Sequence, residues 1–233
     1  MIGPGFKLEY PNVKTRWLLT SLALTLTGAA AQESGVSRAD IAARLNGVEE
    51  SDLRDSVVSG FYEINVGSKV GYISDDGRYL FEGELYDLDS NRNLTEASRA
   101  AARVNLLDGV DPAQMIVFSP KDRSVEHTIT IFTDVDCGYC RQFHREIDRV
   151  TALGVEVRYL FYPRTGPATE SWAKAERVWC AADQHAALTN AKLGGPVPEA
   201  TCAQNPVASQ YDLGHQVGVT GTPSVYTSTG VHI

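Results

Sequence analysis

The two cysteines of Cys137-Gly138-Tyr139-Cys140 are the residues whose types and spacing point most directly to chemistry. Residues 127–133 alternate β-branched and polar side chains as a largely buried strand does, and the apolar residues after Cys137 recur with a helical period. Cys137 therefore stands at the start of a helix, where unpaired N–H groups and the helix dipole stabilise a thiolate. Cys140 lies one turn deeper and is expected to be less exposed, which suits it to resolve a mixed disulfide at Cys137. The pattern predicts thiol–disulfide exchange.

A zinc site and a phosphatase loop are alternative interpretations of the same motif. Structural zinc normally takes four ligands, whereas only His144 lies near the cysteine pair and no second close pair follows. We therefore expect no metal and no other cofactor. A Cys-x5-Arg loop would need an arginine where the chain has Phe143 or Glu146.

The remaining cysteines, Cys180 and Cys202, are expected to form a structural disulfide. Four cysteines allow three pairings, and the other two would consume a thiol of the Cys-x-x-Cys motif. The bridge would close a long, irregular, Gly- and Pro-containing loop and contribute roughly 3 kcal/mol. A second redox couple that passes electrons to Cys140 is the alternative, although neither residue stands in a Cys-x-x-Cys motif or at an evident helix start.

Thr222-Pro223 opens a short strand-like run, a position where the missing N–H of proline is tolerated. A cis peptide would turn the backbone of Thr222 outward and offer it to an extended substrate beside Cys137. A trans proline that begins a strand is the simpler interpretation of this segment by itself. Residues 218–221 lack the Lys and Ser/Thr of a phosphate loop.

The first 31 residues indicate a secretory signal peptide. Lys14 and Arg16 precede the apolar stretch 17–28, and residues 29–31 are alanines that satisfy a small-residue cleavage rule after Ala31. The stretch is too short and too rich in Thr and Ser for a membrane span. Because the prolines and glycines of residues 1–12 have no role in such a signal, we expect Val13 to be the true start. These features predict secretion into an oxidising compartment.

Composition excludes some classes of partner. The 233-residue chain has a net charge of −8, which becomes −10 without residues 1–31. No basic block is present, so nucleic acid is not an expected partner. The length after removal of the signal allows one large or two small domains.

The chain is organised as a sheet region, a helix and a second region of mixed type. Ser37 is expected to cap a helix that ends near residues 46–47. It is followed by antiparallel strands at 61–66, 69–74 and 79–85. This region has no Cys or His and is expected to bind or dimerise. Thr95 is expected to cap an Ala-rich helix that ends at 108–109, either as a semi-rigid linker closing near Pro112 or as an ordinary packed helix.

The second region alternates strands and helices. The strands at 127–133 and 155–162 flank the Cys137 helix and are expected to pair in parallel. A helical region begins at about Thr169, and another helix spans 207–217 and closes at Gly218.

Taken together, these motifs resemble the bacterial periplasmic disulfide-bond isomerase family, DsbC with DsbG as a relative. The resemblance rests on the run Phe132 to Cys140, on Trp179-Cys180-Ala181, on Cys202 and on residues 218–223. It implies an α+β N-terminal cystatin-like dimerisation domain (32–92), a helical linker (93–112) and an α/β thioredoxin-like domain with a helical insertion (113–233).

The resemblance also implies roles for individual residues. Cys137 would attack and Cys140 would resolve; Thr222, cis Pro223, Gly138 and Tyr139 would bind substrate; Cys180 and Cys202 would form the structural disulfide. The protein would be a V-shaped homodimer, kept reduced by an inner-membrane reductase of the DsbD type. It would reshuffle non-native disulfides in unfolded or misoxidised secreted proteins.

Three other functions use the same features. A DsbG-like reductase of sulfenylated cysteines needs the same thiols, a holdase chaperone needs only an apolar cleft, and a donor oxidase would be a monomer. Family members continue past the proline strand into a hairpin partner and a final helix. Because this chain stops at Ile233, we expect a C-terminally incomplete, less stable thioredoxin domain with an aggregation-prone strand.

Overall fold

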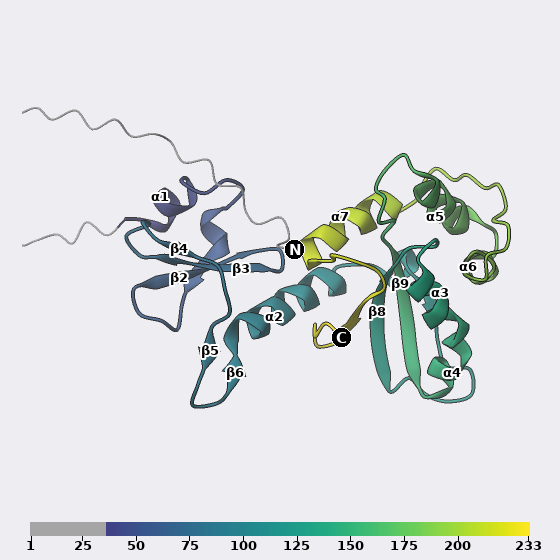
Figure 1. The fold of residues 1–233 in the computed structure, drawn as a ribbon, viewed down its shortest axis with the longest axis horizontal. Helices are drawn as coiled ribbons and strands as arrows, with labels where there is room; N and C mark the ends of the chain where they lie inside the picture. The colour runs from purple at the N-terminus through teal and green to yellow at the C-terminus, as the bar shows by residue number, and fades with distance from the viewer. Residues whose placement is uncertain (1–35) are drawn as a thin grey trace, which may run out of the picture. The chain divides into compact units, whose positions relative to one another are not determined.

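The computed structural model describes residues 36–233, which form two compact units (Figure 1). Residues 36–64 with 71–81 make the first unit, and residues 65–70 with 82–233 make the second. The predicted signal peptide, its cleavage after Ala31 and the start at Val13 lie outside the described residues. Within the described part of the chain, no helix has the length and apolar character needed to cross a membrane.

The first unit is built on a four-stranded sheet in the order β1-β2-β3-β4. Its elements are α1 (Arg38–Ala42), η1 (Glu50–Asp52), β1 (Leu53–Asp55), β2 (Phe61–Val66), β3 (Lys69–Ser74) and β4 (Leu80–Phe81). Ile41 from the helix and Leu53, Ile64, Tyr72 and Ile73 from the strands are buried. The bounds of β2 and β3 confirm the expected strands.

Two elements of this unit are shorter than predicted. Ser37 does cap α1, since its Oγ accepts a hydrogen bond from the Asp40 N–H at 3.1 Å. The helix nevertheless ends at Ala42, because the N–H groups of Arg44 and Leu45 bond to carbonyls three residues back instead of four. The strand expected at 79–85 shrinks to β4, which pairs with β3 only at Leu80 and Phe81.

The second unit holds a mixed sheet in the order β10-β8-β9-β7, in which β8 and β9 are parallel and β10 and β7 antiparallel. Its strands are β5 (Tyr86–Asp87), β6 (Arg92–Asn93), β7 (Ile116–Phe118), β8 (His127–Thr133), β9 (Val155–Phe161) and β10 (Ser224–Thr227), of which β5 and β6 form a separate hairpin. Its helices are α2 (Leu94–Asp108), η2 (Pro112–Gln114), α3 (Gly138–Arg145), α4 (Ile147–Ala152), α5 (Glu170–Cys180), α6 (Gln184–Lys192) and α7 (Val207–Val217). The parallel pair confirms the strand–helix–strand prediction.

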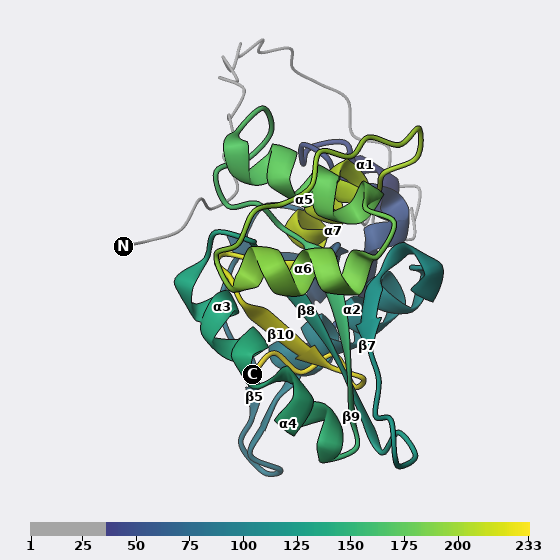
Figure 2. The same ribbon diagram turned by 90° about the vertical axis from the view of Figure 1, so that its right-hand side faces the viewer.

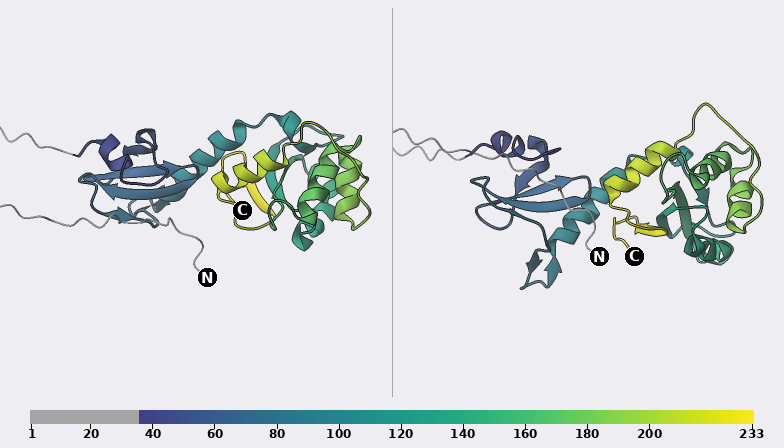
Figure 3. Two further views of the ribbon diagram at one scale, coloured as in Figure 1. Left: turned by 90° about the horizontal axis from the view of Figure 1, so that it is seen from above. Right: turned by 45° about the horizontal axis from the view of Figure 1, so that its top comes forward.

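Helices cover both faces of this sheet (Figures 1 to 3). Side chains alternate along β8, so Ile131 joins a core with α4, α5 and α6, whereas Phe132 joins a core with α2 and α7. The helix expected at 207–217 is confirmed as α7, and Gly218 closes it in a left-handed conformation with φ of 89°. The sheet thus carries β8 and α3 through the middle of a layered domain.

Three local expectations were wrong. The helix predicted from the helical period after Cys137 is interrupted at Glu146, whose ψ of 7° separates α3 from α4. The loop expected to be irregular between the outer cysteines contains α6. Asn93, and not Thr95, caps α2 by accepting the Glu96 N–H, while Thr95 is buried and its hydroxyl accepts the Leu85 N–H.

Because α2 packs against α7 within the second unit, it is the ordinary packed helix of the two alternatives.

Residues after β10 fold back along that strand. Gly230 lies in the turn, Tyr226 and His232 form an antiparallel bridge, and the Ile233 N–H donates to the Val225 carbonyl at 3.0 Å. The outer edge of β10 is therefore paired over this short stretch.

Candidate active site

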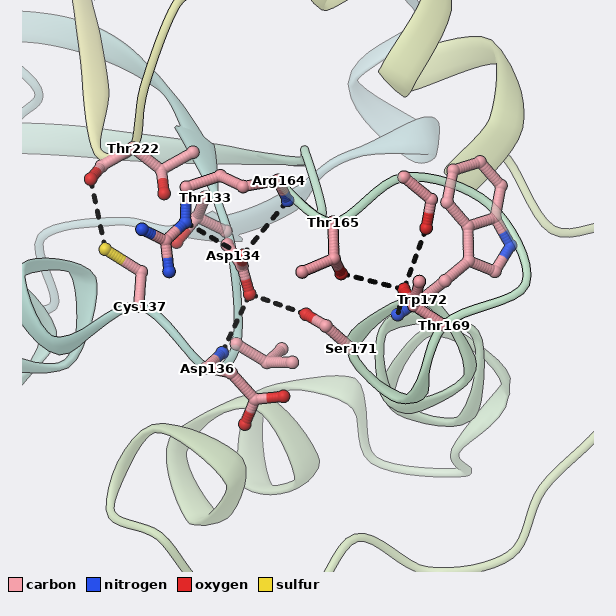
Figure 4. Close-up of polar contacts among 12 residues, drawn as sticks. Thr133, Asp134, Asp136, Cys137, Arg164, Thr165, Thr169, Ser171, Trp172 and Thr222 are labelled. Carbon is pink, nitrogen blue, oxygen red and sulfur yellow. Dashed lines mark hydrogen bonds and ion pairs between the residues drawn. The ribbon is translucent and has the colours of Figure 1, made fainter.

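The sheet places the two cysteines at the carboxyl end of β8. After Thr133 the chain turns through residues 134–136, and Cys137 occupies the N-cap of α3 as predicted. Both thiols are only 1% exposed, so the expected difference in exposure is wrong. Cys137 is covered because the Thr222-Pro223 segment packs over it, and its Sγ–H donates to the Thr222 carbonyl at 3.0 Å (Figure 4).

The Thr222-Pro223 peptide bond is cis, so the trans interpretation is wrong. The segment lies between the cap of α7 and the start of β10, and β10 pairs with β8, the strand that leads to Cys137. This pairing brings Thr222 to Cys137, 85 positions away in the chain. The structure therefore brings Thr222 and Pro223 to the dithiol.

The remaining predicted site residues lie at the start of α3 and in the disulfide near α5. Gly138 begins α3, and Tyr139 beside it is 75% exposed. Cys180 and Cys202 are bonded to each other with Cα atoms 5.4 Å apart, as expected, and link the end of α5 to the loop before α7.

The two thiols differ in acidity despite their equal exposure. Burial opposes ionisation of Cys137, but hydrogen bonding by the Thr222 side chain and by Cys140, with the positive charge of Arg164, holds the pKa of the Cys137 thiol below its ordinary value. Burial raises the pKa of Cys140, and this effect outweighs the nearby charge of Lys192 and hydrogen bonding by Thr133. Cys137 is therefore the thiol suited to react as a thiolate.

A buried carboxylate, Asp134, organises the turn that leads to Cys137 (Figure 4). It is 1% exposed and accepts hydrogen bonds from the Ser171 hydroxyl at 2.6 Å and the Asp136 N–H at 2.8 Å. It also accepts from the Arg164 N–H at 3.1 Å and from Arg164 Nε at 3.0 Å. Burial would raise the pKa of Asp134, but these hydrogen bonds lower it, so the carboxylate stays ionised and holds Arg164 in place.

His144, the single residue considered as a zinc ligand, has both ring nitrogens engaged. Nδ1 lies 3.0 Å from the Tyr159 hydroxyl, and Nε2 lies 3.0 Å from the Thr189 hydroxyl. Among residues 36–233, no group of three or more His, Cys, Asp and Glu side chains is arranged to hold a metal ion. In this arrangement, His144 contributes to packing.

Sequence reasoning missed three charged residues of this site: Asp134, Arg164 and Lys192. Asp134 is part of the motif run, but its burial depends on Ser171 and Arg164, which are distant in sequence. A signal for Lys192 was present, because it continues the buried stripe of α6 formed by Ala187, Leu188 and Ala191. A lysine on such a stripe must find polar partners inside the fold.

Both parts of the chain match known protein families. Residues 27–96 match the model of the disulfide bond isomerase protein N-terminal domain, and residues 113–233 match that of the thioredoxin-like domain. The thiol:disulfide interchange protein DsbC of Salmonella typhimurium is 34% identical over 94% of this chain and 89% of its own length. The chain belongs to the DsbC family.

The DsbC protein of a second organism agrees with this membership. The DsbC of Escherichia coli is 33% identical over 84% of this chain and 83% of its own. A crystal structure of a disulfide interchange protein from Neisseria gonorrhoeae is 28% identical and covers 50% of this chain and 81% of its own, with a TM-score of 0.44. As a DsbC-family member, the chain is a thiol–disulfide oxidoreductase with a DsbC-type N-terminal domain and a thioredoxin-like domain.

Proposed function

We propose that this DsbC-family protein is a periplasmic disulfide isomerase and reductase that works through Cys137 and Cys140. One observation carries the proposal: a thiol at the N-cap of α3 has a lowered pKa and lies 3.0 Å from the carbonyl of Thr222, next to a cis proline. The same segment that contacts the thiol can offer backbone groups to an extended chain. Substrate sulfur and enzyme sulfur would then meet beside Thr222.

The reaction begins with one attack, and the resulting mixed disulfide can be resolved in two ways. The Cys137 thiolate attacks a substrate disulfide, forms a mixed disulfide and releases the other substrate sulfur as a thiolate, which takes a proton from water. A substrate thiolate can then displace Cys137, which leaves a rearranged substrate and a reduced enzyme. Alternatively, Cys140 attacks Cys137, which forms the Cys137–Cys140 disulfide and releases reduced substrate.

Substrate recognition is assigned to Thr222, Pro223, Gly138 and Tyr139. The exposed ring of Tyr139 offers apolar contact beside the thiol, and the Thr222 backbone offers hydrogen bonds that do not depend on substrate sequence. Such contacts favour unfolded or misoxidised secreted proteins over one folded partner.

The assembly extends the same proposal. We assign residues 32–92 to dimerisation, 93–112 to a helical segment and 113–233 to catalysis, in a homodimer that a DsbD-type membrane reductase keeps reduced. The match to the DsbC N-terminal domain and the oxidising location expected from the signal sequence support this assignment.

Refolding of a scrambled multi-disulfide protein tests the proposal. Wild type is expected to restore native activity in catalytic amounts. Cys137→Ser is expected to lose this ability, because the remaining thiol, Cys140, is buried and burial raises its pKa. Cys140→Ser is expected to start the reaction but to accumulate mixed disulfides. Unchanged refolding by Cys137→Ser would remove that thiol from the role.

Assays with other substrates and readouts separate the remaining candidate functions. A sulfenic-acid reductase would act faster on a sulfenylated substrate than on a scrambled one. A holdase would suppress aggregation equally well as the Cys137→Ser/Cys140→Ser variant. An oxidase would act on reduced substrate without a reducing partner.

A further inference from the structure

Lys192 is a fully buried lysine behind the dithiol. Its side chain is 0% exposed at the end of α6, a burial that lysine almost never shows without a charged partner. None of the ion pairs among the described residues includes it. Instead, Nζ lies 2.6 Å from the Thr133 hydroxyl and 2.8 Å from the Asp134 carbonyl.

These two partners connect Lys192 with the resolving thiol. The Thr133 hydroxyl is itself fully buried and hydrogen-bonds the Cys140 sulfur, so it stands between that sulfur and Nζ. The Asp134 carboxylate points instead to Ser171, Asp136 and Arg164. Lys192 thus faces the thiol through one hydroxyl, without a carboxylate to hold its charge.

The surrounding charges set the protonation of Lys192. Burial lowers its pKa to about 8, against the attraction of Cys140, Asp134 and Cys137; Arg141 on α3 lowers it further. His144, also on α3, is buried nearby and uncharged at neutral pH. With a pKa of about 8, Lys192 is mostly an ammonium near pH 7 but exchanges readily with a minor neutral form. The neutral amine keeps an N–H for the Asp134 carbonyl and has a lone pair to accept the Thr133 O–H.

We propose that Lys192 is a positioning residue that accepts the proton of Cys140 through the Thr133 hydroxyl when Cys140 attacks the mixed disulfide at Cys137. This inference rests on the proposed function. The Cys140 S–H proton passes to Thr133 Oγ1 as the Thr133 O–H proton passes to Nζ. The Cys140–Cys137 bond forms, the bond between Cys137 and the substrate breaks, and the substrate leaves as a thiolate.

The burial of Cys140 explains why such a residue is needed. Water has little access to a thiol that is 1% exposed, and burial raises the pKa of Cys140. A neighbouring group that removes the proton, and then stabilises the thiolate as an ammonium, speeds the step that releases substrate. The first attack by Cys137 does not need Lys192, because Thr222 and Arg164 already favour the Cys137 thiolate.

The two steps can be timed separately with Ellman's reagent on the full chain. Attack by Cys137 releases one thionitrobenzoate, and attack by Cys140 on the resulting mixed disulfide releases the second. Lys192→Met removes the amine at nearly constant length, and Thr133→Val removes the hydroxyl at nearly constant volume. Lys174→Met, whose amine pairs with Asp136 and Glu170, is the matched control.

We expect Lys192→Met to slow the second release about three- to tenfold near pH 7 and to leave the first within about twofold. The lower limit arises because each tenfold loss of thiolate is offset by about a threefold gain in nucleophilicity. The slowing should vanish at high pH, where Cys140 ionises unaided. Thr133→Val should slow the same step, and the double variant should be no slower than Lys192→Met.

Several results would overturn the inference. Equal slowing of both releases, or a slowing of the second that is independent of pH, would make Lys192 a structural residue. If the double variant slows the second release by the product of the two single effects, Lys192 does not act through Thr133. If Lys192→Met fails to fold, a normal second release in Thr133→Val would refute the proposal by itself. A first release that survives in Cys137→Ser would instead contradict the proposed function.

Discussion

Removal of the Asp134 carboxylate is expected to be the most destabilising single change near the dithiol. In Asp134→Ala, four hydrogen bonds disappear from a site that is 1% exposed. The Arg164 guanidinium is 47% exposed and can turn into water, so its charge is not stranded. The Ser171 hydroxyl, the Asp136 N–H and the Arg164 backbone N–H also lose their acceptor, and of these the Ser171 hydroxyl is the buried donor.

The magnitude follows from these three donors, of which the two backbone N–H groups are only partly buried. Each buried donor without a partner costs about 1–3 kcal/mol, which gives about 2–4 kcal/mol once some relaxation is allowed. For a chain of this length, that loss lowers the melting temperature by about 4–16 °C. The carboxylate has a lowered pKa, so its contribution is present above about pH 4 and is lost as the pH falls through its folded value.

Urea unfolding followed by circular dichroism measures this loss directly. Glu199→Ala removes a carboxylate that is 86% exposed although it also pairs with an arginine, Arg177, and should change the unfolding free energy by less than about 0.5 kcal/mol. A difference between Asp134→Ala and wild type of less than about 1 kcal/mol near pH 7 would refute the reasoning. So would a difference that stays constant down to about pH 2.

Two further predictions concern buried groups around the site. Burial lowers the pKa of His144 to about 4, so the unfolded chain binds a proton at a higher pH than the folded protein does. The free energy of unfolding should therefore fall by up to about 3 kcal/mol between about pH 6.5 and about pH 4. In His144→Leu, the free energy of unfolding measured in urea should change less over this pH range. If the two proteins lose stability in parallel, His144 is not responsible. Gly214→Ala should destabilise α7 by about 1–3 kcal/mol, although alanine favours helices, because the new Cβ would overlap Tyr162 Cδ2 and lie 2.6 Å from its Cε2. Gly138→Ala, which meets nothing within 4 Å, is the control, and a Gly214→Ala protein that melts at or above the wild-type temperature would contradict this packing argument.

Local patterns were sufficient for much of the fold and for the reactive pair. The bounds of β2, β3, β8 and α7 follow from alternation, helical period and a glycine cap, which act over a few residues. The helix start at Cys137 and the pairing of Cys180 with Cys202 also needed only spacing and counting. Where tertiary contacts compete with these patterns, the predictions were wrong: α1 and β4 are shorter than expected, and Asn93 replaces Thr95 as the cap of α2.

The environment of the thiols was decided only by tertiary structure. The sequence alone determined that two thiols stand at a helix start, because that depends on neighbours along the chain. Burial of Cys137, the cis Thr222-Pro223 bond and the position of Lys192 depend on β10 and α6, which return to β8 from about 90 and about 60 residues away, respectively. Acidity depends on which charges and hydrogen bonds surround a buried group, and the fold supplies these from distant segments.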